Sequence, residues 1–270
     1  METYTISPPT APKVPILLSI PHCGTAFPDE IRDQYVPELI AAPDDTDWFV
    51  DRLYDFAPSM GITVIAGVLS RWVIDLNRDP QNKPLYNDGR IITSLCPVTT
   101  FAGEPLYKDA RKEVDNGEVT RRRKLYFEPY HRKLTALLNE MKAEFGEALL
   151  WDCHSIRHIV PSIRKERFPD LILGSADATS ASAKLIETAL NCLGGGPYSL
   201  SHNHPFKGGY ITRHYGKPAE NIHALQLEMN KINYMDDSET MYDTRRAKKT
   251  ADLLNKTLSE LSRTLLSPQD

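Results

Sequence analysis

The sequence has few cysteines, no long hydrophobic run and no strong excess of charge of one sign. Its four cysteines are spaced neither as a zinc ribbon nor as a disulfide framework, so we expect free thiols in a reducing compartment. No apolar run approaches the roughly 20 residues that a membrane-spanning helix needs. The first residues also lack the basic and apolar segments of a signal peptide. These absences predict a cytoplasmic protein that does not act at a membrane.

The balance of charge also excludes a class of partner. A net charge of -4 over 270 residues argues against the basic surface of a nucleic-acid-binding protein. The local exception is the basic run at residues 121–124, which has acidic neighbours in a helical pattern and predicts a solvated helix face. No phosphate-binding loop or dinucleotide-binding glycine pattern is present. We therefore expect a small-molecule ligand rather than nucleic acid.

Strand-like and helix-like patterns alternate along the chain. Strands are predicted at residues 14–20, 62–66, 72–76, 148–153, 171–173 and 223–229, with a glycine-led strand or hairpin arm at 208–213. Helices are predicted at residues 49–57, 130–145, 180–193 and 251–265. This alternation predicts an α/β fold, with a mixed, mainly parallel central sheet flanked by helices on both faces.

We expect a single domain over residues 1–270, because neither repeats nor a clean linker interrupt the pattern. Residues 1–13 are rich in proline and threonine and are predicted to form a loose lead-in. Residues 79–117 carry many proline, glycine and asparagine residues and little periodicity. So long a loop in a compact domain is often functional.

Two histidines that follow apolar strands are candidate metal ligands. His154 ends the run that begins at Ala148, with Asp152 two residues before it, and His22 follows the run at 14–20. At the carboxyl edge of a sheet a histidine can bind a metal or move a proton, and a nearby carboxylate can orient it. Catalytic zinc sites combine such ligands with a third one and leave a position open for water. We therefore expect zinc or another divalent metal.

The sequence leaves the third ligand open between two aspartates. Thr25 stands where a His-x-x-Glu pair starting at His22 would need its glutamate. Asp45 and Asp47 lie at the start of a predicted helix, where an aspartate can also simply cap the helix. We take Asp47 as the predicted ligand and keep Asp45 as the alternative.

Glu228 is the candidate general base. In the strand at 223–229, Leu225, Leu227 and Met229 share one face, and Glu228 lies on the other. A glutamate close to the metal can take a proton from the attacking water and later pass it to a leaving amine. The alternative is a surface glutamate on an edge strand.

Three arginines are candidate clamps for a substrate carboxylate. Arg71, Arg78 and Arg213 each offer a guanidinium, which binds a carboxylate through two parallel hydrogen bonds. Arg78 follows a predicted strand, and Arg213 follows the glycine pair at 208–209. Any of the three can instead form a surface ion pair.

Six short motifs occur in order at residues 19–24, 45–48, 70–78, 151–156, 206–216 and 225–229. The most specific are Arg-Trp-Val-Ile-Asp-Leu-Asn-Arg at 71–78 and Lys-Gly-Gly-Tyr-Ile-Thr-Arg-His-Tyr-Gly at 207–216. Together the six motifs resemble the N-formylglutamate amidohydrolases, the deformylases of histidine breakdown. The resemblance extends over nearly the whole chain.

The resemblance implies a fold like the zinc-dependent exopeptidases and aspartoacylases. It implies zinc-dependent hydrolysis of N-formyl-L-glutamate to formate and L-glutamate, with Asn77 and Arg78 facing the substrate and His154 binding zinc. Thr25 departs from the His-x-x-Glu pair of those relatives. Two other functions stay open: an amidohydrolase or carboxypeptidase for another N-acyl amino acid, and a non-catalytic binder of acidic metabolites.

Overall fold

A mixed β-sheet forms the centre of the computed structural model, which describes residues 1–83 and 93–267. In this part of the chain the sheet has seven strands in the order β1-β3-β2-β4-β7-β5-β6. They are β1 (Tyr4–Ser7), β2 (Ile16–Ile20), β3 (Thr63–Gly67), β4 (Ala148–Ile156), β5 (Leu171–Gly174), β6 (Leu200–His202) and β7 (Ile222–Asn230). Strands β3, β2, β4 and β7 are parallel, whereas β1 and β5 run antiparallel to β3 and β7. The predicted mainly parallel, mixed sheet is confirmed.

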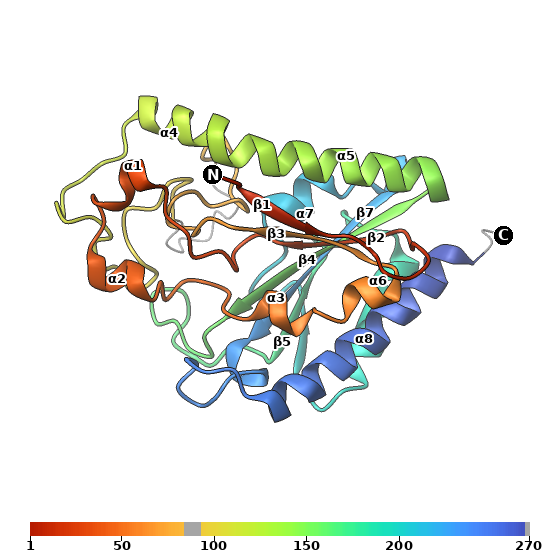
Figure 1. Cartoon of the computed structure of the whole chain (residues 1–270). Coiled ribbons are helices and arrows are strands. Elements are labelled where there is room, and N and C mark those ends of the chain that lie inside the picture. The colour runs from red at the N-terminus through yellow and green to blue at the C-terminus, as the bar shows by residue number, and fades with distance from the viewer. Residues whose placement is uncertain (84–92, 268–270) are drawn as a thin grey trace.

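Helices cover both faces of the sheet, as predicted (Figure 1). They are α1 (Asp29–Arg32), α2 (Pro37–Ala41), α3 (Val50–Leu53), α4 (Asn116–Arg122), α5 (Glu128–Phe145), α6 (Ala183–Gly194), α7 (Tyr210–Tyr215) and α8 (Thr244–Leu266). A π-helical segment, Arg123–Phe127, joins α4 to α5. Helices α5 and α7 pack on one face, and α3, α6 and α8 on the other. None of the helices in the described ranges is long and apolar enough to cross a membrane.

The central strands β4 and β7 explain where the chemistry lies. Both are almost wholly buried, because alternate side chains enter the two apolar cores on opposite faces. Trp151 and Leu225 enter the core under α8, whereas Leu150 enters the core under α5. Toward the carboxyl ends of these strands, polar residues replace apolar ones on the α5 side. The sheet therefore gathers polar groups at one edge, beneath the loops.

The predicted strand at 72–76 is wrong. These residues form consecutive turns, with the Val73 amide bonded to the Ser70 carbonyl at 2.9 Å and the Arg78 amide to the Asp75 carbonyl at 3.2 Å. Trp72 and Val73 are nevertheless buried, since this loop packs into the core on the α5 side. The apolar run reflects a buried loop, and periodicity alone does not distinguish this from a short buried strand.

Three other local predictions need correction. Residues 208–213 are not a strand, because helix α7 begins at Tyr210 after the two glycines. Residues 1–13 are not loose throughout, since β1 pairs with β3 along its whole length. The predicted helix at 49–57 is helical only at Val50–Leu53, with a 3-10 turn following at Ala57–Met60. In each of these segments tertiary packing overrides the local preference of the sequence for one secondary structure.

The basic run at 121–124 is only partly solvated. Arg122 is fully buried, and its Nη1 donates to the hydroxyls of Tyr35 and Tyr107 and to the carbonyl of Val73. Glu118 accepts a hydrogen bond from its Nε at 2.7 Å. This arginine therefore stabilises the 70–78 loop through the Val73 carbonyl, and it does not lie on a solvated helix face.

Candidate active site

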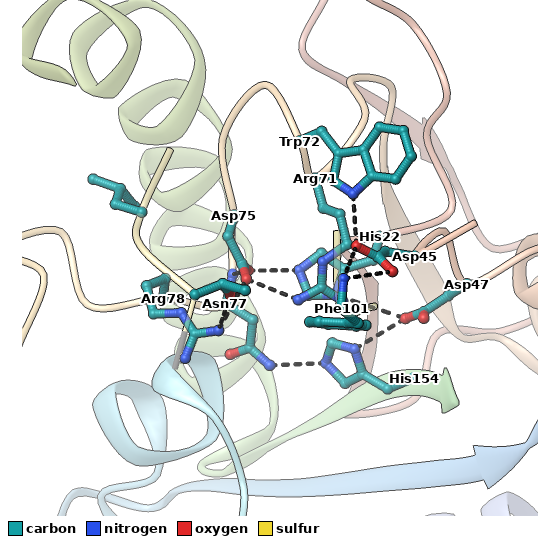
Figure 2. Close-up of polar contacts among 12 residues, drawn as sticks. His22, Asp45, Asp47, Arg71, Trp72, Asp75, Asn77, Arg78, Phe101 and His154 are labelled. Carbon is teal, nitrogen blue, oxygen red and sulfur yellow. Dashed lines mark hydrogen bonds and ion pairs between the residues drawn. The ribbon is translucent and has the colours of Figure 1, made fainter. Parts of the chain in front are cut away.

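Three of the predicted residues converge at the carboxyl edge of the sheet (Figure 2). Ligand atoms of His22, Asp47 and His154 all lie within 4.8 Å of one another, and the three side chains are buried. Asp47 Oδ2 is 3.1 Å from His154 Nδ1 and 3.6 Å from His22 Nδ1. The loop that carries Asp47 is held there by a backbone hydrogen bond to the His22 carbonyl. Two imidazoles and a carboxylate are a suitable donor set for zinc.

The second nitrogen of each histidine contacts a buried carboxylate. His22 Nε2 lies 2.8 Å from Asp75 Oδ1, and His154 Nε2 lies 2.9 Å from Asp152 Oδ2. A proton on His22 Nε2 that is directed at Asp75 leaves the Nδ1 lone pair of this ring facing Asp47, and Nδ1 of His154 faces Asp47 as well. Within the described residues, His22 Nδ1 is buried and has no hydrogen-bond partner. An unsatisfied buried lone pair in this arrangement fits a metal ion.

The structure distinguishes between the two candidate aspartates. Asp45 accepts hydrogen bonds from Trp72 Nε1 at 2.7 Å and from the Phe101 amide at 3.0 Å (Figure 2). It is not part of the group that surrounds the possible metal position. Asp47 is therefore the aspartate that could bind the ion, and Asp45 shapes the adjacent wall.

The electrostatics of the site favour a positive charge between these side chains. Burial raises the pKa of Asp47, but hydrogen bonds and charge interactions with His154 and His22 outweigh it, and the net pKa is below the usual value. Burial lowers the pKa of His154, yet Asp152 and Asp47 raise it well above its usual value. The same carboxylates that stabilise a proton on His154 would stabilise a bound cation.

Two of the predicted arginines lie next to the histidines and share an aspartate. Arg71 Nη2 donates to Asp75 Oδ2 at 2.8 Å, and Arg78 Nη2 is 3.4 Å from the same oxygen. The Arg71 guanidinium also lies over the Phe101 ring, 4.7 Å from its centroid. A guanidinium has five N–H donors, so both arginines retain donors for a ligand.

Asn77 connects the 70–78 loop to α7. Its Oδ1 accepts a hydrogen bond from the Ile211 amide at 2.7 Å, which turns Nδ2 toward Asp152 at 3.3 Å. A Cβ on Gly209 would lie 2.4 Å from Asn77 Nδ2, so this close approach requires glycine. The amide thereby packs beside His154, from whose Nε2 it is 2.9 Å away.

Glu228 lies beside His154 on the neighbouring strand, in register with it. It is half-buried, and Gln226 Nε2 is 3.5 Å from its Oε2. Burial, to which Asp47 adds, raises the pKa of Glu228 to about 8, although His154 opposes the shift. A carboxylate with a pKa in this range can accept and return a proton near neutral pH. Because β7 lies between β4 and β5, the edge-strand alternative for Glu228 is wrong.

A cleft unites these groups. The residues lining it include seven of the eight predicted site residues: His22, Asp47, Arg71, Asn77, Arg78, His154 and Glu228. Arg213 does not line this cleft. It is exposed on α7, and its Nε donates to the Gly208 carbonyl at 2.9 Å. Its predicted contact with substrate stays a prediction.

Sequence reasoning missed several residues that line the cleft. Asp75 lies inside the 71–78 motif, and its position before two substrate-facing candidates was the available signal. Gln226 lies two residues before Glu228 on the same face of β7. Thr93 and Phe101 come from the long loop predicted at 79–117, of which residues 84–92 lie outside the described part. No local pattern identified these two, since they lie on irregular backbone.

The sequence model of the N-formylglutamate amidohydrolases matches residues 14–235. The chain belongs to this family. It is 44% identical to an N-formylglutamate deformylase of Pseudomonas putida over 232 residues, which is 84% of each chain. It is 43% identical to one of Pseudomonas aeruginosa over 226 residues, covering 83% of this chain and 84% of the relative.

One solved structure agrees with this assignment, and a second shares the fold. An N-formylglutamate amidohydrolase from Ralstonia eutropha has a TM-score of 0.80 at 25% identity, with 97% of this chain and 98% of that chain covered. A gene product from Agrobacterium tumefaciens shares the fold, with a TM-score of 0.72 at 17% identity over 97% of this chain and 96% of that one. The family, the fold class and the amidohydrolase class predicted from the sequence are confirmed. Metal dependence stays a prediction.

Proposed function

We propose that this protein hydrolyses N-formyl-L-glutamate to formate and L-glutamate with the help of a divalent metal. The family and the names of the two Pseudomonas relatives support the reaction. The observation that carries the metal dependence is the pair of histidines whose Nε2 atoms contact Asp75 and Asp152 while their Nδ1 atoms face Asp47.

Zinc is the ion that we favour, because two imidazole nitrogens and one carboxylate form a three-ligand set of the kind found in catalytic zinc sites. His22 Nδ1, His154 Nδ1 and Asp47 would hold it. A bound zinc ion would supply Lewis-acid activation of the formyl group and of the attacking water. Asp75 and Asp152, which contact the Nε2 atoms, would orient the two imidazoles for such binding.

Glu228 carries the proton in this proposal. Its carboxylate accepts a proton from water as the water oxygen bonds to the formyl carbon. The same proton then passes to the nitrogen of glutamate as the carbon–nitrogen bond breaks, and this regenerates the carboxylate. A pKa raised to about 8 suits a group that must first accept a proton and then donate it.

The arginines would bind substrate carboxylates. Arg71 and Arg78 line the cleft on the side of Asp75, which holds their guanidinium groups in place. Asn77 would present its amide beside them. Arg213, which the sequence also suggests as a carboxylate clamp, does not line the cleft and remains a further candidate. Since the substrate has two carboxylates, more than one cationic group is needed.

We further propose that the reaction belongs to histidine breakdown and takes place in the cytoplasm. The names of the relatives support the substrate, and the unpaired state of all four cysteines is consistent with a reducing compartment. A deletion strain grown on histidine should accumulate N-formylglutamate. Normal growth without accumulation would contradict this role.

The direct test is hydrolysis by the purified protein, measured as formate released from N-formyl-L-glutamate and N-formylaspartate and as acetate released from N-acetylglutamate. Chelator treatment should abolish turnover, and zinc should restore it. Faster hydrolysis of another acyl amino acid would identify a related amidohydrolase. Binding without turnover would identify a non-catalytic binder, and activity that survives complete metal removal would contradict the metal proposal.

A further inference from the structure

A second cavity adjoins the proposed active site. Phe101, Ser155 and Ile156 line both the active-site cleft and this cavity, so the two are adjacent. The rest of the second cavity comes mostly from the segment after β4. Its apolar lining consists of Phe101, Ala102, Ile156, Ile159, Val160 and Pro161. Such a wall suits a short hydrocarbon chain rather than a polar group.

One buried cation also lines this cavity. Lys231 begins the 3-10 turn that follows β7, and only 3% of its surface is exposed. Its Nζ donates to the backbone carbonyl of Asp44 at 3.1 Å. Within the described residues Nζ makes no other hydrogen bond, and no carboxylate lies within ion-pair distance of it. Because an ammonium has three donors, two remain available.

The other charged groups around the cavity are already satisfied. Arg157 binds the Asp44 carboxylate at 3.0 Å and Glu239 Oε2 at 3.1 Å. The Asp45 carboxylate accepts from Trp72 and from the Phe101 amide, as described above. A buried ammonium without a bound carboxylate is costly. The lysine is therefore the group that an incoming anion would stabilise.

We propose that Lys231 and this apolar cavity form the subsite for the side chain of the substrate, with the γ-carboxylate bound to Nζ. The inference rests on the proposed function and deepens it. The two side-chain methylenes of glutamate would pack on the apolar wall, and the carboxylate at their end would reach the lysine. Arg71 and Arg78 would then bind the α-carboxylate in the first cleft. The enzyme thereby distinguishes glutamate from amino acids that have neutral side chains.

The test compares Lys231→Met with a matched surface control, Lys248→Met, whose exposed lysine pairs with Asp252 on α8. Turnover of N-formylglutamate and N-formylglutamine is measured, because the second substrate has nearly the same shape but no γ-charge. Losing a charged hydrogen bond should raise KM for N-formylglutamate about 10–100-fold in Lys231→Met. KM for N-formylglutamine and the metal content should stay near wild type, and Lys248→Met should change neither.

A purely structural lysine would give a different result. Lys231 could instead serve only to anchor the Asp44 carbonyl, and through it the loop of Asp47. In that case KM should rise by the same factor for both substrates in Lys231→Met, and the metal content should fall. Equal losses would therefore overturn the subsite. Partial recovery of the preference for N-formylglutamate in Lys231→Arg would support it, since arginine restores the charge.

Product binding separates this inference from the proposed function. If the wild-type protein releases no formate from N-formylglutamate, the proposed function fails. The subsite is then judged by calorimetric titration of the metal-loaded protein with L-glutamate and L-glutamine. Tighter binding of glutamate that disappears in Lys231→Met supports the subsite. Equal affinity for both amino acids, or no binding of either, overturns it.

Discussion

Asp75 Oδ1 lies 2.8 Å from His22 Nε2, and the carboxylate that makes this contact is almost completely buried. Its other oxygen accepts from Arg71 at 2.8 Å. Burial opposes ionisation, but Arg71, His22 and Arg78 hold the pKa of Asp75 well below its usual value. One carboxylate therefore orients a proposed metal ligand and a proposed substrate clamp at the same time. Metal binding and substrate binding should be coupled through it.

Asp75→Asn should weaken both functions. The amide keeps the size of the side chain but cannot accept from His22 and Arg71 as a carboxylate does. Loss of such a partner typically lowers metal affinity about 10–100-fold, and the loosened arginine should raise KM as well. Metal affinity is measured by chelator competition, and KM with saturating metal.

Asp152→Asn is the matched control, because Asp152 contacts His154 and neither Arg71 nor Arg78. It should weaken metal binding with a smaller effect on KM. If Asp75→Asn bound zinc as tightly as the wild type, Asp75 would not orient the ligand.

A second prediction separates the two aspartates of the 43–47 loop. Asp47→Asn should yield a folded protein with little bound zinc, whereas Asp45→Asn should keep its zinc and lose part of the packing around Phe101. His22→Ala and His154→Ala should behave like Asp47→Asn. Elemental analysis after dialysis measures the metal, and circular dichroism checks the fold. Full zinc content in His154→Ala would remove this residue from the ligand set.

The sequence revealed some parts of this site because they follow regular elements. His22 follows β2 by two residues and His154 lies near the carboxyl end of β4, and parallel strands bring these ends to one edge of the sheet. Glu228 was found from the alternation along β7, which the two apolar cores confirm. Period-two patterns are reliable here because each face of the sheet has its own core.

Other parts depend on contacts that no local pattern encodes. Asp45 and Asp47 are two residues apart on an irregular loop, and only their contacts in the folded protein show which of them faces the histidines. Trp72 is apolar and buried, which indicated a strand, yet it packs from a loop. Phe101 and Lys231 reach the cavities through tertiary packing of the chain, so their positions became visible only in the structure.

His131 supports the 70–78 loop from α5, and its environment predicts a pH effect on stability. Its Nε2 donates to the Leu76 carbonyl at 2.9 Å, and burial lowers its pKa from 6.5 to about 3. The unfolded chain therefore binds a proton that the folded protein excludes between these values. The free energy of unfolding should fall as the pH drops from about 6.5 toward 3, by up to ~1.4 kcal/mol per pH unit from this group.

His131→Gln should remove that contribution while keeping an N–H donor for the Leu76 carbonyl. Urea denaturation of both proteins at several pH values between about 4 and 7, where His131 protonates in the unfolded chain but not in the folded protein, measures the difference. The wild type should lose stability more steeply on acidification than the variant. Parallel curves would show that His131 is not the group responsible.

Replacing the proposed arginine clamps by lysine tests whether the paired guanidinium donors matter beyond their positive charge. Arg71→Lys and Arg78→Lys keep a cation but lose the planar pair of donors, so KM for N-formylglutamate should rise about tenfold or more for each. A substrate that lacks the matching carboxylate should show a smaller change. Arg213→Lys tests the third candidate in the same assay. An unchanged KM there would show that Arg213 does not contact the substrate.

The last prediction concerns Glu228, which should be essential for turnover and dispensable for binding. Glu228→Gln keeps the size of the side chain and removes the proton acceptor. The variant should retain zinc and the affinity for glutamate, because the proposed ligands and clamps are unchanged. Its kcat should fall by about 10²–10⁴-fold, toward the upper limit because one group serves as both base and acid.

The pH profile distinguishes a lost base from a merely disturbed site. A base must be unprotonated to act, so wild-type activity should rise with pH through the Glu228 titration, and burial moves that pKa upward from its usual value near 4.5 to about 8. In Glu228→Gln this acidic limb should be absent from the residual activity. Near-normal turnover, or an unchanged acidic limb in the variant, would assign the proton transfer to another group, with Asp152 and His214 as the next residues to substitute.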